Sequence, residues 1–277
     1  MRPFGDAPTA KGISLIRDTE IERTIRSYAA PILRVAELDE EAFNIHIVQS
    51  GDINAFVARG QRLFITTGLL RRSTNANQLI GVIAHEIGHI TGGHLARTKI
   101  ALEKAGTTAL ITQIMGVAAG ILTENMSTAS GIIKGGENVV ARSFLNYSRG
   151  QEQSADQAAV RFLDKAGFSS RGMLDFLKVL SGQELLHSNQ QDPYMLTHPL
   201  TSGRIAFVRH HVINSRFSNR PTPPNFSIMH RRLVAKLDGY IDAPSKTFRR
   251  YSDTDNSVAA LYLFSYTHLT LPTSDLV

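Results

Sequence analysis

Hydrophobic residues recur along most of this chain at the three- and four-residue intervals that are typical of amphipathic helices. The first such stretch, residues 21–33, follows Thr19 and Glu22, whose spacing matches a capping box. Pro31 falls inside this helix and is expected to kink it or to restrict it locally. Further helices are predicted from Asn75 to about residue 90, at 151–166 with Gly167 as the C-terminal stop, at 172–180, from about 201, at 228–241 and at 255–264.

Three shorter stretches have strand character. Residues 44–48, 55–58 and 62–67 are rich in β-branched and aromatic residues, and turn residues separate them. Together they fit a small antiparallel sheet. The predicted fold class is therefore α+β, a mainly helical domain that contains one small antiparallel sheet.

The composition narrows the class of protein. The chain has 277 residues, 42% of them hydrophobic and 19% charged, which indicates a folded globular protein. It has no cysteine, which excludes disulfide scaffolds, iron–sulfur clusters, thiolate zinc sites and cysteine nucleophiles. Any metal must therefore be held by histidine and carboxylate side chains. No apolar signal segment opens the chain and no run reaches about 20 apolar residues, so the chain as given is expected to be soluble, as a mature or truncated form.

The charge of the chain is unevenly distributed. The net charge is +6, but residues 201–251 contain ten Lys or Arg and only two Asp or Glu. This segment could face an acidic partner or an anionic membrane surface, although solvated helix faces are the simpler interpretation. No basic motif with interleaved aromatic residues indicates base stacking, so no nucleic-acid partner is expected.

One motif carries most of the candidate chemistry, namely His85-Glu86-Ile-Gly-His89. Residues four apart on a helix lie within about 40° of each other, so both imidazoles can reach one metal. Glu86 lies one residue further round, close enough to act on a metal-bound water. Such a short string can occur by chance, but its apolar helical context favours a catalytic metal site.

The motif leaves the third metal ligand open. The metzincin pattern requires a histidine at position 95, where this chain has Leu95. On a continued helix His94 would lie about 180° from His85, so it fits packing or a hydrogen bond to a ligand better than zinc binding. Glu152 is the better candidate, because Asp156 follows it by four residues on the same helical face. Two acids on a packed face need a metal and an imidazole N–H as partners, so Asp156 is expected to orient a ligand histidine. The alternative is a solvated acidic face.

A third motif, His198-Pro-Leu-Thr-x-x-Arg204, lies further along the chain. Together with the two motifs above, it resembles the gluzincin metallopeptidases that include the CAAX-prenyl endopeptidase and the heat-shock protease HtpX. The resemblance spans about residues 12–264, includes Asn54-Ala-Phe56, and points to a periplasmic branch in which TPR repeats follow the protease domain. It implies a zincin-type domain with one Zn²⁺ per chain.

The resemblance also implies a role for each site residue. The zinc ligands would be His85, His89 and Glu152, and Glu86 would be the general base. Pro199 stiffens the loop that holds His198, which would be either a fourth metal ligand or a group that stabilises the transition state. The first turn of a helix disfavours cations by about 0.3–1 kcal/mol, so Arg204 is expected to have a partner, either a carboxylate of the site or the developing oxyanion.

The expected function is hydrolysis of peptide bonds in misfolded or misassembled envelope proteins by a zinc endopeptidase. Residues 62–67 are expected to offer a sheet edge to an extended substrate. The apolar segment 109–133 is expected to be a lid or a contact with membrane-embedded substrates, with a core helix as the alternative. Two other functions stay open, namely a chaperone-like binding module with an occluded or inactive zinc site and a zinc hydrolase of non-peptide substrates.

The resemblance implies a location and a division of the chain. The location would be the periplasm or cell envelope of a Gram-negative bacterium, with outer-membrane assembly proteins as partners through the TPR-like region. The chain would comprise a flexible lead over 1–12, a zinc metalloprotease domain over 13–225, a helical linker with the truncated start of a TPR-like region over 226–264, and a tail foreign to the domain over 265–277.

Overall fold

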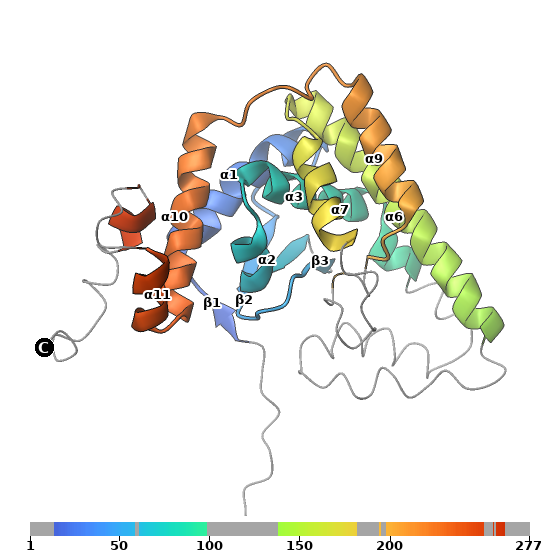
Figure 1. Cartoon of the computed structure of the whole chain (residues 1–277). Helices are drawn as coiled ribbons and strands as arrows, with labels where there is room; N and C mark the ends of the chain where they lie inside the picture. The colour runs from blue at the N-terminus through green and yellow to red at the C-terminus, as the bar shows by residue number, and fades with distance from the viewer. Residues whose placement is uncertain are drawn as a thin grey trace, which may run out of the picture.

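A computed structural model describes residues 14–58, 61–98, 138–181, 194, 198–251, 257 and 259–263 (Figure 1). The flexible lead, the apolar segment 109–133 and the tail from residue 265 lie outside these residues. The strands are β1 (Leu15–Ile16), β2 (Asn44–Val48), β3 (Ala55–Ala58) and β4 (Arg62–Thr66). The helices are α1 (Thr19–Val35), α2 (Thr67–Arg72), α3 (Ala76–Thr91), α6 (Asn138–Ala166), α7 (Arg171–Ser181), α9 (Ser202–Asn214), α10 (Pro224–Ile241) and α11 (Pro244–Arg250).

The four strands form one mixed sheet in the order β1-β2-β4-β3. The three predicted strands are present, and the two-residue strand β1 was not predicted. The prediction of an antiparallel sheet is wrong for its central pair, because β2 and β4 run parallel, whereas β1 with β2 and β3 with β4 run antiparallel. The α+β class with a mainly helical content is confirmed.

The side chains of Thr66, at the end of β4, and of Thr67, at the start of α2, bind the segment that connects β2 to β3. Thr66 Oγ1 donates to Asp52 O at 2.7 Å, and Thr67 Oγ1 donates to Ser50 O at 2.8 Å, so both hold the connection that crosses from β2 to β3. On the sheet face opposite the core, the ring of Phe64 stacks between His46 of β2 and Phe56 of β3. These contacts join residues that are distant in sequence, and periodicity alone does not reveal them.

The N-cap of helix α1 lies one residue before the expected one. The Asp18 carboxylate accepts hydrogen bonds from the backbone of Glu20 and Ile21 at 3.1 and 3.0 Å, so Asp18 and not Thr19 is the N-cap. Helix α1 runs through Pro31 without interruption to Val35. Its buried face carries Ile21, Ile25, Tyr28, Ala29, Ile32 and Leu33, as the spacing of these residues predicts.

Helix α3 is the central element of the fold. Asn75 caps it as predicted, since its side chain accepts from the Gln78 N–H at 3.1 Å. Helices α1, α6 and α7 pack around α3, and nearly all its residues are buried. Gly88 permits the close approach of α6, because a Cβ at this position would lie 2.7 Å from Ala155 O. The close contact between α3 and α6 brings the two predicted metal-binding segments together.

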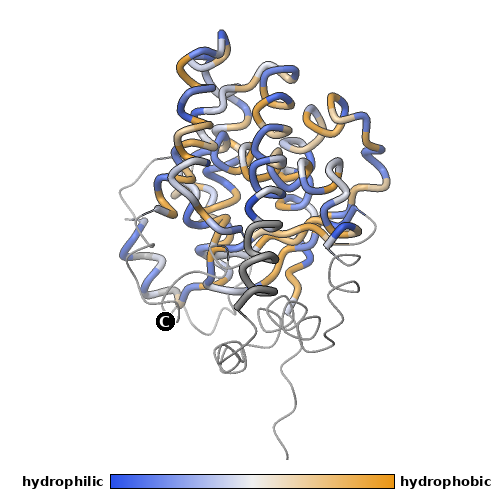
Figure 2. The backbone as a smooth tube through the Cα atoms, turned by 90° about the vertical axis from the view of Figure 1, so that its right-hand side faces the viewer, coloured by the Kyte–Doolittle hydropathy of each residue, from blue (hydrophilic) through white to orange (hydrophobic). Residues whose placement is uncertain are grey.

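Helices α6, α7, α9 and α10 follow the predicted ranges, with some differences at their ends, whereas α2 and α11 were not predicted. Helix α6 begins at Asn138, thirteen residues before the predicted start, and ends at Ala166, where Gly167 follows with φ +74° as expected for a helix stop. Thr201 caps α9, and residues 259–263 are helical. In Figure 2 the helices alternate between hydrophobic and hydrophilic segments along their length, as expected for helices with one buried face.

Helices α10 and α11 lie on the side of the molecule away from α6 and α9 (Figure 1). Helix α10 packs on α1 and α2, and its Leu233 and Leu237 belong to the same core as α1. The buried Asp238 of α10 accepts from Arg71 of α2 at 2.6 Å and from Arg250 of α11 at 2.8 Å. The predicted division of the chain at residue 225 stays a prediction. Among the residues described, no helix combines the length and the apolar character needed to cross a membrane.

Candidate metal centre

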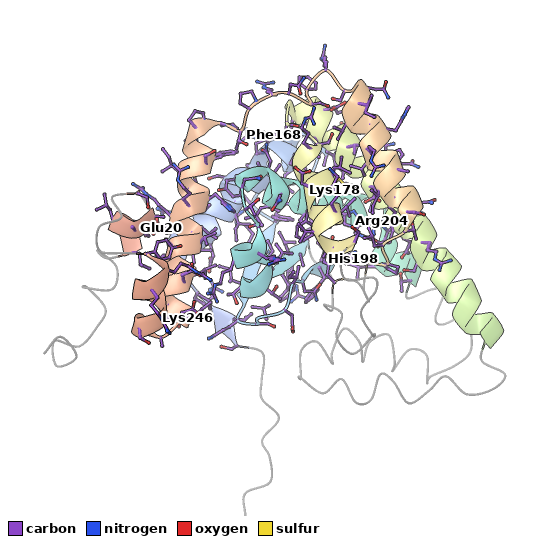
Figure 3. The ribbon with its side chains drawn as sticks, in the orientation of Figure 1. Glu20, Phe168, Lys178, His198, Arg204 and Lys246 are labelled. Carbon is purple, nitrogen blue, oxygen red and sulfur yellow. The ribbon has the colours of Figure 1, made fainter. Side chains whose placement is uncertain are left out.

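Three elements bring the predicted site residues together. Helix α3 carries His85, Glu86 and His89, helix α6 carries Glu152 and Asp156, and the turn before α9 carries His198 and Pro199. All the charged and imidazole side chains of this group are buried. Figure 3 shows His198 and Arg204 close together at the N-terminal end of α9.

The donor atoms of four side chains converge. His85 Nε2 lies 3.0 Å from His89 Nε2 and 3.2 Å from Glu152 Oε2, and Glu152 Oε1 lies 3.2 Å from His89 Nε2. His198 Nδ1 completes the group, 3.4 Å from His85 Nε2 and 3.3 Å from Glu152 Oε1. Ligand atoms of a tetrahedral zinc ion, each about 2.0–2.1 Å from the metal, are about 3.3 Å from one another. The spacing of these four donor atoms therefore fits Zn²⁺.

Asp156 and Arg204 form a second layer behind the converging donors. Asp156 Oδ1 lies 2.9 Å from His85 Nδ1, the ring nitrogen that faces away from the cluster. Arg204 donates from Nε to Asp156 Oδ2 at 2.6 Å and from Nη2 to Asp156 Oδ1 at 2.9 Å. Its Nη1 lies 2.9 Å from Glu152 Oε2 and donates to Pro199 O at 3.1 Å. Arg204 was expected to have a carboxylate partner, and it has two, Asp156 and Glu152.

The buried charges determine which groups are ionised. Burial would raise the pKa of Glu152, but the nearby imidazole of His198 and the guanidinium of Arg204 outweigh it and hold this pKa well below its usual range. Burial lowers the pKa of His89 to about 3. Burial also acts to lower the pKa of His85, but Asp156 and Glu152 prevail and raise it to about 10. Glu152 and His89 are thus in the anionic and neutral forms that a metal cation needs, whereas His85 would release a proton on binding the metal.

Glu86 differs from the other acids of the site. It is fully buried, and within the described residues neither of its carboxylate oxygens has a hydrogen-bond partner. The imidazole Nε2 of His198 lies 3.5 Å from Glu86 Oε1. Burial raises the pKa of Glu86. A carboxylate without fixed partners beside a cluster of metal-binding atoms is suited to taking up and releasing a proton.

His198 joins the cluster to the sheet. Its Nδ1 faces the donor atoms of His85 and Glu152, and its Nε2 lies 3.2 Å from Ala55 O of strand β3. Its ring stacks on Tyr194 with the centroids 4.4 Å apart, and its backbone N–H donates to Tyr194 O at 2.7 Å. Because Nε2 faces a carbonyl, it carries the proton, and Nδ1 presents a lone pair to the cluster. Sequence reasoning assigned no role to Tyr194, and it noted the Asn54-Ala-Phe56 stretch without assigning a role to the Ala55 carbonyl.

His94 lies beside the cluster and not in it. Its Nδ1 lies 2.9 Å from His89 Nδ1, the ring nitrogen of that ligand candidate that faces away from the converging donors. This contact is compatible with both predicted roles of His94, packing and a hydrogen bond to a ligand.

The predicted sheet edge needs correction. Strand β4 was expected to offer a free edge to substrate, but it lies between β2 and β3. Strand β3 is the outer strand at this side of the described sheet, and it contacts α3. The error follows from the assumed antiparallel order, in which β4 would have been the last strand.

A helix with His-Glu-x-x-His that faces a glutamate from a second helix defines a zinc metallopeptidase of the gluzincin type. The comparison with known families agrees with this class. The family model described as "Peptidase family M48" matches residues 16–212, and the chain belongs to this family. The resemblance noted from the motifs is thereby confirmed, and zinc is the metal of these enzymes.

Several curated proteins are similar to this chain. The "Beta-barrel assembly-enhancing protease" of Yersinia pestis is 30% identical over 246 residues, which cover 88% of this chain and 47% of that protein. The protein of the same name from Escherichia coli strain K12 is 30% identical over 197 residues, or 70% of this chain and 39% of that protein. "Metalloprotease YcaL" of Escherichia coli strain K12 is 25% identical over 174 residues, covering 62% of this chain and 63% of that protein. The chain spans less than half the length of the two assembly-enhancing proteases.

Proposed function

We propose that this chain is the catalytic part of a zinc-dependent endopeptidase that cleaves misfolded or misassembled proteins of the bacterial cell envelope. The observation that carries the catalytic proposal is the fully buried Glu86, whose carboxylate has no hydrogen-bond partner among the described residues, beside the converging donor atoms of His85, His89 and Glu152. A structural zinc site would need no such acid, whereas a hydrolase needs a base close to the metal.

In the proposed mechanism, His85, His89 and Glu152 would hold the metal. When bound, zinc acts as a Lewis acid that polarises the scissile carbonyl and makes an attacking water more acidic. Glu86 takes the proton from that water and passes it to the leaving amine. Its raised pKa favours the protonated form that the second of these steps needs.

Asp156 and Arg204 would act as positioning residues. Asp156 Oδ1 lies 2.9 Å from His85 Nδ1, and a proton held on this nitrogen would leave the Nε2 lone pair for the metal. Arg204 holds Asp156 and Glu152 in place and binds the Pro199 carbonyl of the loop before α9. Because its guanidinium is occupied by these partners, we propose that Arg204 acts through the two carboxylates and not through contact with the oxyanion.

His198 would be a fourth metal ligand in the resting enzyme. Its Nδ1 lone pair faces the same point as the other three donors, which favours this role over assistance in the transition state. A fourth protein ligand closes the position that the attacking water needs. The enzyme would therefore be restrained until His198 moves.

An extended substrate would pair with strand β3. Strands β3 and β4 are antiparallel, and the Asn54 carbonyl accepts a hydrogen bond from the Thr66 N–H. Because hydrogen-bonded residues alternate along such a pair, the N–H and C=O groups of Ala55 and Val57 point away from β4. A substrate strand can pair with these groups and needs few side-chain pockets, which suits the cleavage of diverse unfolded proteins. Because His198 bonds to Ala55 O, it would compete with the substrate for this carbonyl.

The location and the partners of the enzyme are part of the proposal. The names of the relatives from Yersinia pestis and Escherichia coli associate those proteins with β-barrel assembly. By this similarity, we place the chain in the periplasm or envelope of a Gram-negative bacterium, with outer-membrane assembly proteins among its partners. The excess of basic residues between positions 201 and 251 would suit contact with an anionic membrane surface.

The test is to compare the chain with its Glu86→Gln variant for zinc content and for cleavage of fluorescently labelled casein, an unfolded protein. The proposal expects zinc in both proteins and cleavage by the unsubstituted chain alone. Suppression of aggregation by both proteins without cleavage would indicate the chaperone-like module. Zinc binding with neither activity would indicate a hydrolase of other substrates.

A further inference from the structure

The two candidate histidine ligands of α3 have different partners at the nitrogen that faces away from the cluster. His85 Nδ1 lies against a carboxylate oxygen of Asp156, which is a common arrangement for a metal-binding histidine. His89 Nδ1 lies 2.9 Å from another imidazole nitrogen, His94 Nδ1. Both His89 and His94 are at least nine-tenths buried, so water does not substitute for either partner.

The chain turns back on itself to place His94. Helix α3 stops at Thr91, Gly92 is its C-cap, and Gly93 has φ +61°, a conformation that favours glycine. The next helical turn, residues 94–98, brings the ring of His94 back towards His89. Without this turn, a continued helix would direct His94 away from the site.

Helix α6 fixes the same turn from the other side. Gln151 donates from Nε2 to His94 O at 3.1 Å, and it also contacts Thr98 Oγ1 at 3.1 Å. Gln151 immediately precedes Glu152, the third candidate ligand. The backbone of His94 is thus held by the helix that supplies a ligand to the cluster.

Gly92 provides the space for the His94 ring. Its φ of −70° and ψ of −12° are ordinary right-handed helical values that any residue adopts, so the backbone does not require glycine here. A Cβ at this position would instead overlap the ring of His94, with Nε2 as the nearest atom. Any larger residue at position 92 would displace this ring from His89.

We propose that His94 is a positioning residue that accepts a hydrogen bond from His89 Nδ1–H and so fixes the ring and the tautomer with which His89 binds zinc. The inference rests on the proposed zinc-peptidase function. A histidine that binds a metal through Nε2 keeps its proton on Nδ1. The 2.9 Å contact therefore requires that His94 Nδ1 present a lone pair, which places the His94 proton on Nε2.

Edge-to-face packing is the competing explanation for the contact. The rings of His89 and His94 meet at an interplanar angle of 79° with centroids 4.9 Å apart, an arrangement that phenylalanine would also allow. A His94→Phe substitution keeps the ring and removes the acceptor. A His94→Asn substitution removes the ring and keeps an oxygen acceptor near the place of Nδ1. The two explanations therefore predict opposite rankings of these variants.

The experiment measures the zinc dissociation constant of the metal-free proteins by competition with a chelating dye. The proposal expects His94→Phe and Gly92→Ala to weaken zinc binding by about 10–100-fold, the range typical for residues that orient metal ligands. His94→Asn and the control His210→Phe, on the exposed side of α9, are expected to stay within about threefold of the unsubstituted chain. Zinc affinity in His94→Phe within about twofold of the unsubstituted chain would overturn the proposal, as would equal losses in His94→Phe and His94→Asn.

A second measurement needs no variant and covers the case in which the variants do not fold. Long-range ¹H–¹⁵N spectra of the zinc-loaded chain report which imidazole nitrogens carry protons. The proposal expects a proton on His89 Nδ1 and none on His94 Nδ1, and the reverse assignment would overturn it. Failure of the unsubstituted chain to bind zinc would instead contradict the proposed function, so the two failures are distinguishable.

Discussion

Arg204 holds both oxygens of Asp156, with Nε 2.6 Å from Oδ2 and Nη2 2.9 Å from Oδ1. This paired contact joins α9 to α6 inside the protein, where Arg204 is only 2% exposed. Because Asp156 also reaches His85 Nδ1, the guanidinium is linked through one carboxylate to a ligand candidate on α3. One buried network of charged side chains thus joins helices α3, α6 and α9.

Replacing Arg204 with alanine is expected to destabilise the protein, because it leaves the buried carboxylates of Glu152 and Asp156 without their counter-charge. Breaking a buried ion pair in this way costs about 3–5 kcal/mol. Denaturant unfolding of the metal-free protein measures the loss. Arg209→Ala, on the exposed side of the same helix, is the matched control. Equal midpoints for the two variants would show that the pairing contributes little to stability.

Glu86→Gln is expected to keep zinc and to lose about 10²–10⁴-fold in peptide hydrolysis, the range associated with removal of a general base. It should be at least as stable as the unsubstituted chain at neutral pH. The reason is that folding raises the pKa of Glu86, so the ionised carboxylate destabilises the folded state above the unfolded pKa. Hydrolysis rates and denaturant midpoints measured on the same preparation test both parts. A fully active variant would refute the assigned role.

Removal of zinc is expected to lower the melting temperature, since a ligand that binds only the folded state stabilises it by mass action. At a free zinc concentration about 100 times Kd, the gain is about 2.7 kcal/mol. The variants His85→Ala, His89→Ala and Glu152→Ala should each fail to retain zinc and should show no such shift on addition of the metal. Scanning calorimetry with and without a chelator provides the measurement. Full zinc occupancy in Glu152→Ala would show that another group is the third ligand.

Much of the candidate site could be predicted because its residues lie at helical spacing. The four-residue intervals from His85 to His89 and from Glu152 to Asp156 each place two side chains on one helix face. The partner of Arg204 was predictable for a different reason, namely the position of a cation in the first turn of a helix. Each of these inferences needs only local geometry, and the structure agrees with that geometry.

The features that were missed depend on non-local or irregular geometry. The placement of β4 between β2 and β3 depends on contacts such as that of Thr66 with Asp52, which no periodicity encodes. The position of His94 beside His89 depends on the end of α3 at Gly92 and on the positive φ of Gly93, where the geometry of a continued helix no longer applies. The N-cap moved to Asp18 because two adjacent residues can both cap a helix and only packing selects one.

Asp156→Ala is expected to weaken zinc binding by about 10–100-fold, because His85 loses the acceptor that fixes its ring. The same substitution leaves Arg204 with Glu152 as its remaining carboxylate partner at the site. A zinc titration of the metal-free variant measures the effect. Asp164→Ala, on the same helix and away from the cluster, is a suitable control. An unchanged titration in Asp156→Ala would favour a purely structural ion pair with Arg204.

His198→Ala is expected to raise peptide hydrolysis. Its Nδ1 lone pair lies among the donor atoms of the cluster, so its removal opens the fourth position that the attacking water needs. The substitution also frees Ala55 O from its contact with His198 Nε2, which should lower KM for an extended peptide that pairs with β3. The measurement compares kcat and KM on an unstructured fluorogenic peptide. Higher kcat together with lower KM is expected if one imidazole restrains both the metal position and the strand. A lower kcat in this variant would instead assign His198 to the transition state, where its Nε2 lies near Glu86.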